Sequence, residues 1–156
     1  MRLVLALCLI ALTPGVMGDA ASGVNVLEPY ARSAVQVQRN SAVFMRLQNS
    51  SKQKAVVVAA SSPVAENVEL HTHINDRGVM RMRRIPEIVV PPMQATELKP
   101  GGLHIMLLGL RQDLVIGQSI PVTLVFSDSS QQSLLAPVRK VVRPKGMSQH
   151  GQMQKH

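Results

Sequence analysis

Histidine and methionine, two side-chain types that bind soft metal ions, are concentrated in two parts of this 156-residue sequence. The five histidines fall either between positions 71 and 104 or within the last seven residues. In the first group, three pairs share the same spacing of one intervening residue: His71 and His73, Met80 and Met82, His104 and Met106. Because alternate residues of a strand point to one face, each pair can present two ligands to the same side of a sheet. Taken singly, each of these residues is also explained as core packing or a hydrogen-bonded histidine.

The first two pairs flank residues 75–78, whose sequence Asn-Asp-Arg-Gly is typical of a hairpin turn. A tight loop at the two central positions predicts that His73 lies opposite Met80 and His71 opposite Met82. Directly opposed side chains have Cβ atoms about 5 Å apart, close enough to share a metal ion. A bulge at the glycine would shift this register by one residue, so the shared face within each pair is the firmer expectation.

The third pair follows the Pro-Gly-Gly turn at residues 100–102, which we expect to bring it to the same rim of the protein. Thioether and imidazole ligands, with no thiolate and no nearby carboxylate, make a soft site that favours Cu(I) over Mg, Ca or Mn. Zinc normally recruits cysteine or carboxylate ligands. The ligand chemistry therefore predicts a copper site.

Residues 1–18 have the layout of a secretory signal peptide, with an apolar run at 3–12 that is followed by Pro-Gly and small residues. The run is too short to span a membrane, which takes about 20 apolar residues. We expect cleavage after residue 18 or 20 and no transmembrane segment in the mature chain. A lipid anchor at Cys8 is the alternative, disfavoured because Cys8 lies inside the apolar run and follows the bulky Leu7.

Cysteine content and charge exclude several functions. Cys8 is the only cysteine, so the mature chain has no thiolate for a blue-copper centre or for thiol-disulfide exchange. Apart from isolated residues such as Glu69 and Asp76, the three central histidines have no acidic partner at a recognisable motif spacing, which argues against a hydrolase and any other enzyme. Lys and Arg number 17 against 9 Asp and Glu. Export and the presence of only three aromatic residues argue against nucleic-acid binding, which leaves a solvated surface, anionic lipid or an acidic partner to explain the charge.

Short apolar runs between turn signals predict an all-β sandwich in one domain, residues 21–142. The expected strands cover residues 42–47, 55–60, 68–73, 79–82, 104–108 and 119–126. Alternation is clearest in the last of these, where Ile120, Val122, Leu124 and Phe126 share one face. Residues 143–156 lack a β pattern, and we expect them to form a flexible, disordered tail.

At the metal-binding residues the sequence resembles the PCuAC family of periplasmic copper chaperones. That family's motif is His or Met, ten residues, Met, twenty-one residues and His-x-Met, and His71, Met82, His104 and Met106 match it without a gap. The resemblance runs through most of the mature chain, including residues 29–32, 40–49, 68–71, 78–82 and 100–110.

The resemblance implies a cupredoxin-like Greek-key fold in the periplasm, with one Cu(I) bound near the surface by these four residues. It also implies delivery of copper to the Cu-A centre of a terminal oxidase or to another cuproenzyme, beside a thiol-reducing assembly partner. His73 stands where many relatives carry Met, which leaves open whether His71 alone or also His73 contributes to the site. Met80 is a further possible ligand. Tyr30 stands where many relatives carry Trp.

Four further candidate ligands recur every three residues in the tail: Met147, His150, Met153 and His156. Because imidazole accepts Cu(II) readily, we expect a second, weaker copper there, Cu(II) above all; a tail without a metal role is the alternative. Two other functions remain open for the whole chain: copper buffering or tolerance, and a metal-free β-sandwich assembly module.

Overall fold

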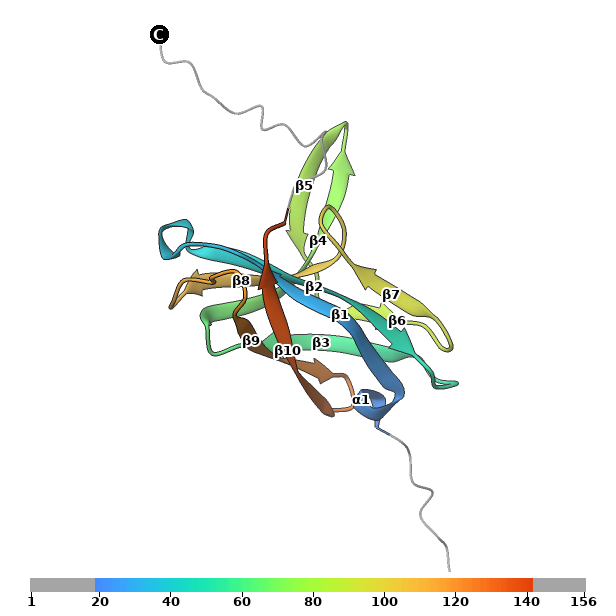
Figure 1. Ribbon diagram of the computed structural model, residues 1–156. Helices are drawn as coiled ribbons and strands as arrows, with labels where there is room; N and C mark the ends of the chain where they lie inside the picture. The colour runs from blue at the N-terminus through green and yellow to red at the C-terminus, as the bar shows by residue number, and fades with distance from the viewer. Residues whose placement is uncertain (1–18, 142–156) are drawn as a thin grey trace, which may run out of the picture.

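The computed structural model describes residues 19–141, which form two packed β layers (Figure 1). The predicted signal peptide, residues 1–18, and the predicted tail, residues 143–156, lie outside the described range. One short helix precedes the strands and a 3-10 turn follows the first of them: α1 (Ala20–Gly23) and η1 (Gln36–Gln38). The ten strands are β1 (Val24–Arg32), β2 (Asn40–Asn49), β3 (Ala55–Ser61), β4 (Ala65–Asp76), β5 (Val79–Arg84), β6 (Ile88–Val90), β7 (Ala95–Leu98), β8 (His104–Leu110), β9 (Ser119–Phe126) and β10 (Gln131–Arg139). None of the helices in this range is long and apolar enough to cross a membrane.

The strands follow one continuous order, β5-β4-β8-β2-β1-β10-β9-β3-β6, and β7 pairs with β2 beside this path. All neighbouring pairs are antiparallel except β1 and β10, which run parallel, with Ala31 beside Val138. This parallel pair joins the first layer, which contains β5, β4, β8 and β2, to the second, which contains β9, β3 and β6. The predicted all-β, cupredoxin-like sandwich is confirmed.

The core lies between the layers. The predicted inward face of β9 is buried, because Ile120, Val122, Leu124 and Phe126 are each at most 1% exposed. Ile105 of β8 is fully buried on the facing layer. Burial of an apolar side chain of this size stabilises the fold by about 1.5–3 kcal/mol. Packing of Ile105 therefore stabilises the position of β8 against the second layer.

All six predicted strands exist, most of them longer than predicted, and four strands were missed. In β1 the pairing with β2 shifts between Leu27 and Tyr30, where Glu28 has a positive φ of 49°. Such a bulge breaks the period-two pattern by which strands are recognised. β6 and β7 have only 3 and 4 residues. β10 begins with polar residues and contains Pro137, which lowers its strand signal.

Candidate metal centre

Three adjacent strands, β5, β4 and β8, carry the four motif residues on the outer face of the first layer. His71 of β4 lies directly opposite His104 of β8, and Met106 lies opposite Glu69, one step along the same face. The intervening Ile105 points the other way, into the core. The two motif histidines are therefore neighbours through strand pairing, and their ring centroids are 5.8 Å apart.

The hairpin between β4 and β5 has a different register from the prediction. Arg77 and Gly78, not the residues at 76 and 77, form the two-residue loop, and their φ angles of 52° and 85° are those that a type I′ turn requires. Met82 consequently lies opposite His73, and His71 lies opposite Arg84. The predicted pairs His73 with Met80 and His71 with Met82 were wrong.

The displacement is two residues, so every side chain keeps its predicted face. Met82 remains on the side of the sheet that carries His73 and is diagonal to His71. Met80 lies opposite Asn75, closer to the hairpin tip, where the Asn75 Oδ1 accepts a hydrogen bond of 2.7 Å from the Gly78 amide. The register thus places Met82 nearer than Met80 to the histidines.

His104 is held by the turn that precedes it. Its imidazole is 2% exposed, and its Nδ1 lies 2.9 Å from the carbonyl oxygen of Gly102. A carbonyl can only accept, so Nδ1 carries the proton and Nε2 keeps a lone pair, the arrangement found in metal-binding histidines. The His73 Nδ1 lies 3.5 Å from the same oxygen, and its ring centroid is 5.1 Å from that of His104.

The pKa of His104 is lowered, mainly because burial disfavours the charged form. The hydrogen bond to Gly102 opposes this shift, whereas His73, His71 and the positive charge of Arg32 add to it. The buried imidazole is therefore neutral over a wider pH range than a solvated one, as a metal ligand must be.

His71 has one ring nitrogen paired and one unpaired. Its Nε2 lies 2.8 Å from Oε2 of Glu69, while Nδ1 is buried without a hydrogen-bond partner. A buried unpaired nitrogen costs roughly 1–3 kcal/mol, which a metal ion at that atom would offset. The Glu69 carboxylate also contacts Arg84 at 3.4 Å. The sequence reasoning missed Glu69 as a histidine partner, although its spacing of two from His71 on one strand places both on one face.

The two motif methionines differ in exposure. Met106 is 8% exposed and packs with Ala42 and Phe44 in a small apolar cluster on this outer face, whereas Met82 is 45% exposed. Phe44 links the cluster to the histidines, with its ring 6.2 Å from that of His104, and Tyr30 lies 5.2 Å beyond it. One thioether is thus fixed inside and the other lies at the edge strand.

Within residues 19–141, no three His, Cys, Asp or Glu side chains are grouped so as to hold a metal ion. The thioethers of Met82 and Met106 lie on the same face as the two histidines. Two imidazoles with two thioethers form a soft ligand set, which favours Cu(I).

Comparison with known proteins connects this geometry to a family. Residues 24–138 match the family described as "Putative lipoprotein LpqE-like". The chain belongs to the LpqE-like family. It is 35% identical over 130 residues to the "Putative lipoprotein Lxx21020" of Leifsonia xyli subsp. xyli, covering 83% of this chain and 75% of that one. It is 32% identical over 117 residues to protein RP573 of Rickettsia prowazekii, covering 72% of this chain and 65% of that protein, slightly under two thirds of its length.

Solved structures share the fold of this LpqE-like chain. The apo PCuAC domain of PmoF1 superposes with a TM-score of 0.65 at 20% identity, covering 76% of this chain and 95% of the domain. The Cu(I) form of DR1885 from Deinococcus radiodurans superposes with a TM-score of 0.61 at 26% identity, covering 83% and 89%. The LpqE-like chain therefore has a PCuAC-like fold.

Proposed function

We propose that this protein is a copper chaperone that binds one Cu(I) through His71, Met82, His104 and Met106. The observation that carries the proposal is the pairing of His71 with His104, in which one buried Nδ1 has no partner and one Nε2 keeps its lone pair. Two thioethers lie on the same face. The DR1885 structure contains Cu(I), and the PCuAC domain of PmoF2 is described as copper-bound, which supports a soft copper site on this fold.

Transfer, rather than permanent storage, is favoured by the unequal exposure of the ligands. Met82 lies on β5, the edge strand, whose residues are all exposed, so an acceptor can displace this ligand first. We propose that the acceptor is the Cu-A subunit of a terminal oxidase or another cuproenzyme, served in the periplasm beside a thiol-reducing partner. The lipoprotein name of a relative supports export.

The decisive experiment is an anaerobic Cu(I) titration of residues 19–156 against a coloured competing chelator. One tight equivalent that His71→Ala abolishes is expected, and the Cu(I) form should be colourless. Cu(II) should give no intense blue thiolate band, because residues 19–156 contain no cysteine. Absence of tight binding, or an unchanged affinity in the variant, would refute the site. Normal oxidase assembly in a deletion strain would favour buffering over delivery.

We propose a second, weaker copper at Met147, His150, Met153 and His156, occupied chiefly as Cu(II). These residues lie outside the described range, and support comes from their sequence alone. A chain that must order itself around an ion binds more weakly than a preformed site. Copper captured there is close in sequence to Val141, which packs against the cluster containing Met106.

A further inference from the structure

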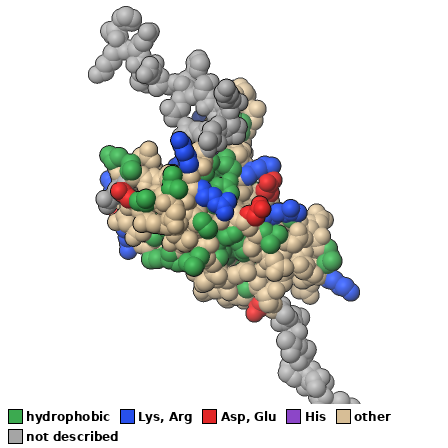
Figure 2. All heavy atoms as spheres, in the orientation of Figure 1, with side chains coloured by type: hydrophobic (Ala, Val, Ile, Leu, Met, Phe, Trp, Pro, Cys, Tyr) green, Lys and Arg blue, Asp and Glu red, His purple; other side chains and the backbone are tan. Residues whose placement is uncertain are grey.

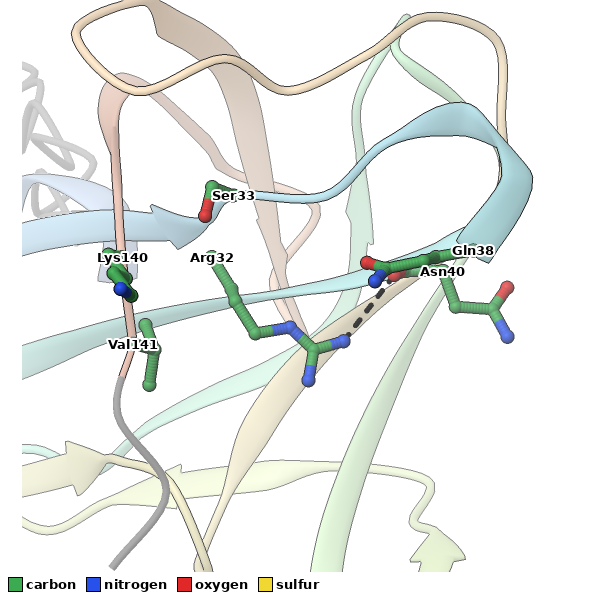
Figure 3. Close-up of a pocket in the computed structure, with 6 residues that line it drawn as sticks. All are labelled: Arg32, Ser33, Gln38, Asn40, Lys140 and Val141. Carbon is green, nitrogen blue, oxygen red and sulfur yellow. Dashed lines mark hydrogen bonds between the residues drawn. The ribbon is translucent and has the colours of Figure 1, made fainter.

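A basic recess of about 500 Å³ lies where the end of β1, the start of β2 and the end of β10 come together (Figure 3). It is lined by Arg32, Ser33, Gln38, Asn40, Lys140 and Val141. Five of these six residues are polar or charged and none is acidic. The Arg32 guanidinium extends across the recess and donates a hydrogen bond of 3.4 Å to the carbonyl oxygen of Asn40. The lining suits an anionic group rather than an apolar ligand.

Strand pairing places a second arginine next to Arg32, beside this recess. Arg32 of β1 and Arg139 of β10 are register partners in the parallel pair, and the Arg139 guanidinium lies 5.6 Å from the centroid of the Tyr30 ring. Tyr30 and Arg32 are two apart on β1, so these cations share the outer face. Two cations on neighbouring strands give this part of the outer face a positive potential.

The recess adjoins the proposed copper site. Val141 packs against the cluster formed by Ala42, Phe44 and Met106. A partner that reaches the copper therefore comes within range of the recess.

A further cation lies on the opposite side of the site, at β5. Arg84 is exposed there and shares the face of Met82, whereas Arg81 and Arg83 point to the other face. The nearby carboxylates are already paired, with Glu69 contacting His71 and Arg84, and Asp76 contacting Arg81 at 3.2 Å. Glu97, on β7, is bonded to Lys99 at 2.8 Å. Figure 2 shows blue Lys and Arg side chains near the middle of the molecule's visible face, with fewer red ones among them.

We propose that the recess is a docking site for Asp or Glu side chains of the protein that receives copper, an inference that rests on the proposed function. The chain's own tail is a poor occupant, because residues 142–156 contain Arg143, Lys145 and Lys155 and no acidic side chain. A second copy is also disfavoured by the net charge of +8. Complementary charge accelerates the encounter of two proteins and fixes their orientation.

The test measures Cu(I) transfer to two synthetic apo peptides that share a Cys and His copper site. One peptide carries four flanking Glu residues and the other carries Gln instead. Anaerobic stopped-flow absorbance of the copper-thiolate product gives the rate. The test variant is Arg139→Gln with Lys140→Gln. The matched control is Lys52→Gln with Lys54→Gln, in the exposed loop after β2. Since β2 has ten residues and begins at Asn40, this loop lies about 30 Å from Asn40.

At low salt, the wild-type protein should transfer copper faster to the Glu peptide than to the Gln peptide. The recess variant should transfer copper to the Glu peptide about three- to tenfold more slowly than the wild type. The control, with the same net charge, should transfer normally, and 0.5 M NaCl should abolish the differences. Equal losses in both variants, or equal rates for both peptides, would overturn the docking proposal. Binding to phosphatidylglycerol vesicles is measured in parallel. If the recess variant bound these vesicles more weakly but transferred copper at the normal rate, the docking proposal would also be overturned. A chelator titration of each variant separates these results from failure of the copper site itself.

Discussion

Replacement of methionine by leucine tests the site without changing its packing. We expect Met82→Leu and Met106→Leu to weaken Cu(I) binding, whereas Met45→Leu should leave it unchanged. Met45 is 2% exposed and lies in the main core, so it is a control for burial without ligation. Leucine conserves volume, and such swaps cost less than about 1.5 kcal/mol of stability.

The magnitude of the affinity loss follows from the ligand's role. Removing a partner that only orients a ligand costs about 10- to 100-fold in metal affinity. Removing a direct ligand should therefore cost at least about 100-fold. The effect on stability should not follow the effect on copper affinity. Met82 is 45% exposed, so its substitution should change the free energy of unfolding by less than about 0.5 kcal/mol.

The assay combines chelator competition for Cu(I) with urea unfolding of the metal-free protein. Two variants should lose copper affinity, while all three retain a cooperative transition. Should the three substitutions weaken Cu(I) binding equally, affinity would depend on general packing and the assignment of thioether ligands would be incorrect.

Three further predictions concern the surroundings of the site. Glu69→Gln should lower Cu(I) affinity about 10- to 100-fold by removing the carboxylate that orients His71, while Glu97→Gln should not; chelator competition measures both. Because folding lowers the pKa of His104, the unfolded chain binds more protons than the folded protein below about pH 6.5. The contribution of His104 to the free energy of unfolding of the metal-free protein should therefore be constant above that pH and fall below it. Urea unfolding measures this fall, which should be smaller in His104→Gln. Truncation after Pro144 should preserve the tight Cu(I) equivalent and remove a weaker equivalent, mainly for Cu(II). Binding of this weaker equivalent should decline between about pH 7 and 5. If the truncated protein bound as many copper ions as residues 19–156, a tail site would be excluded.

The sequence predicts the faces of this fold better than its pairings. Alternation in β9 and the shared face of His104 and Met106 follow from the period of a strand, which is local. The neighbouring positions of His71 and His104 depend on β4 pairing with β8, strands that are separated by three others in sequence. The family motif supplied that connection, because no local pattern contains it.

The hairpin register shows how one residue changes a detailed prediction. The predicted loop, residues 76–77, and the observed loop, residues 77–78, both contain Arg77; they differ in whether Asp76 or Gly78 is the other loop residue. The observed loop places the non-glycine Arg77 at a φ of 52°, which is uncommon, and this shift of one position moves the pairing by two. The exposure difference between Met82 and Met106 was equally hidden, since it depends on which strand forms the edge.

The parallel pairing of the first and last strands has a kinetic consequence. Gln132 of β10 donates a hydrogen bond of 3.1 Å to the carbonyl oxygen of Val24 in β1, across 108 residues of chain. Closing such long loops slows folding, and sheets dominated by distant pairings fold in milliseconds to seconds. During synthesis or export, β1 has no partner on this side until nearly the whole domain has emerged. The edge that later borders the basic recess is therefore among the last to form, and until then the unpaired side of β1 is a potential site of aggregation.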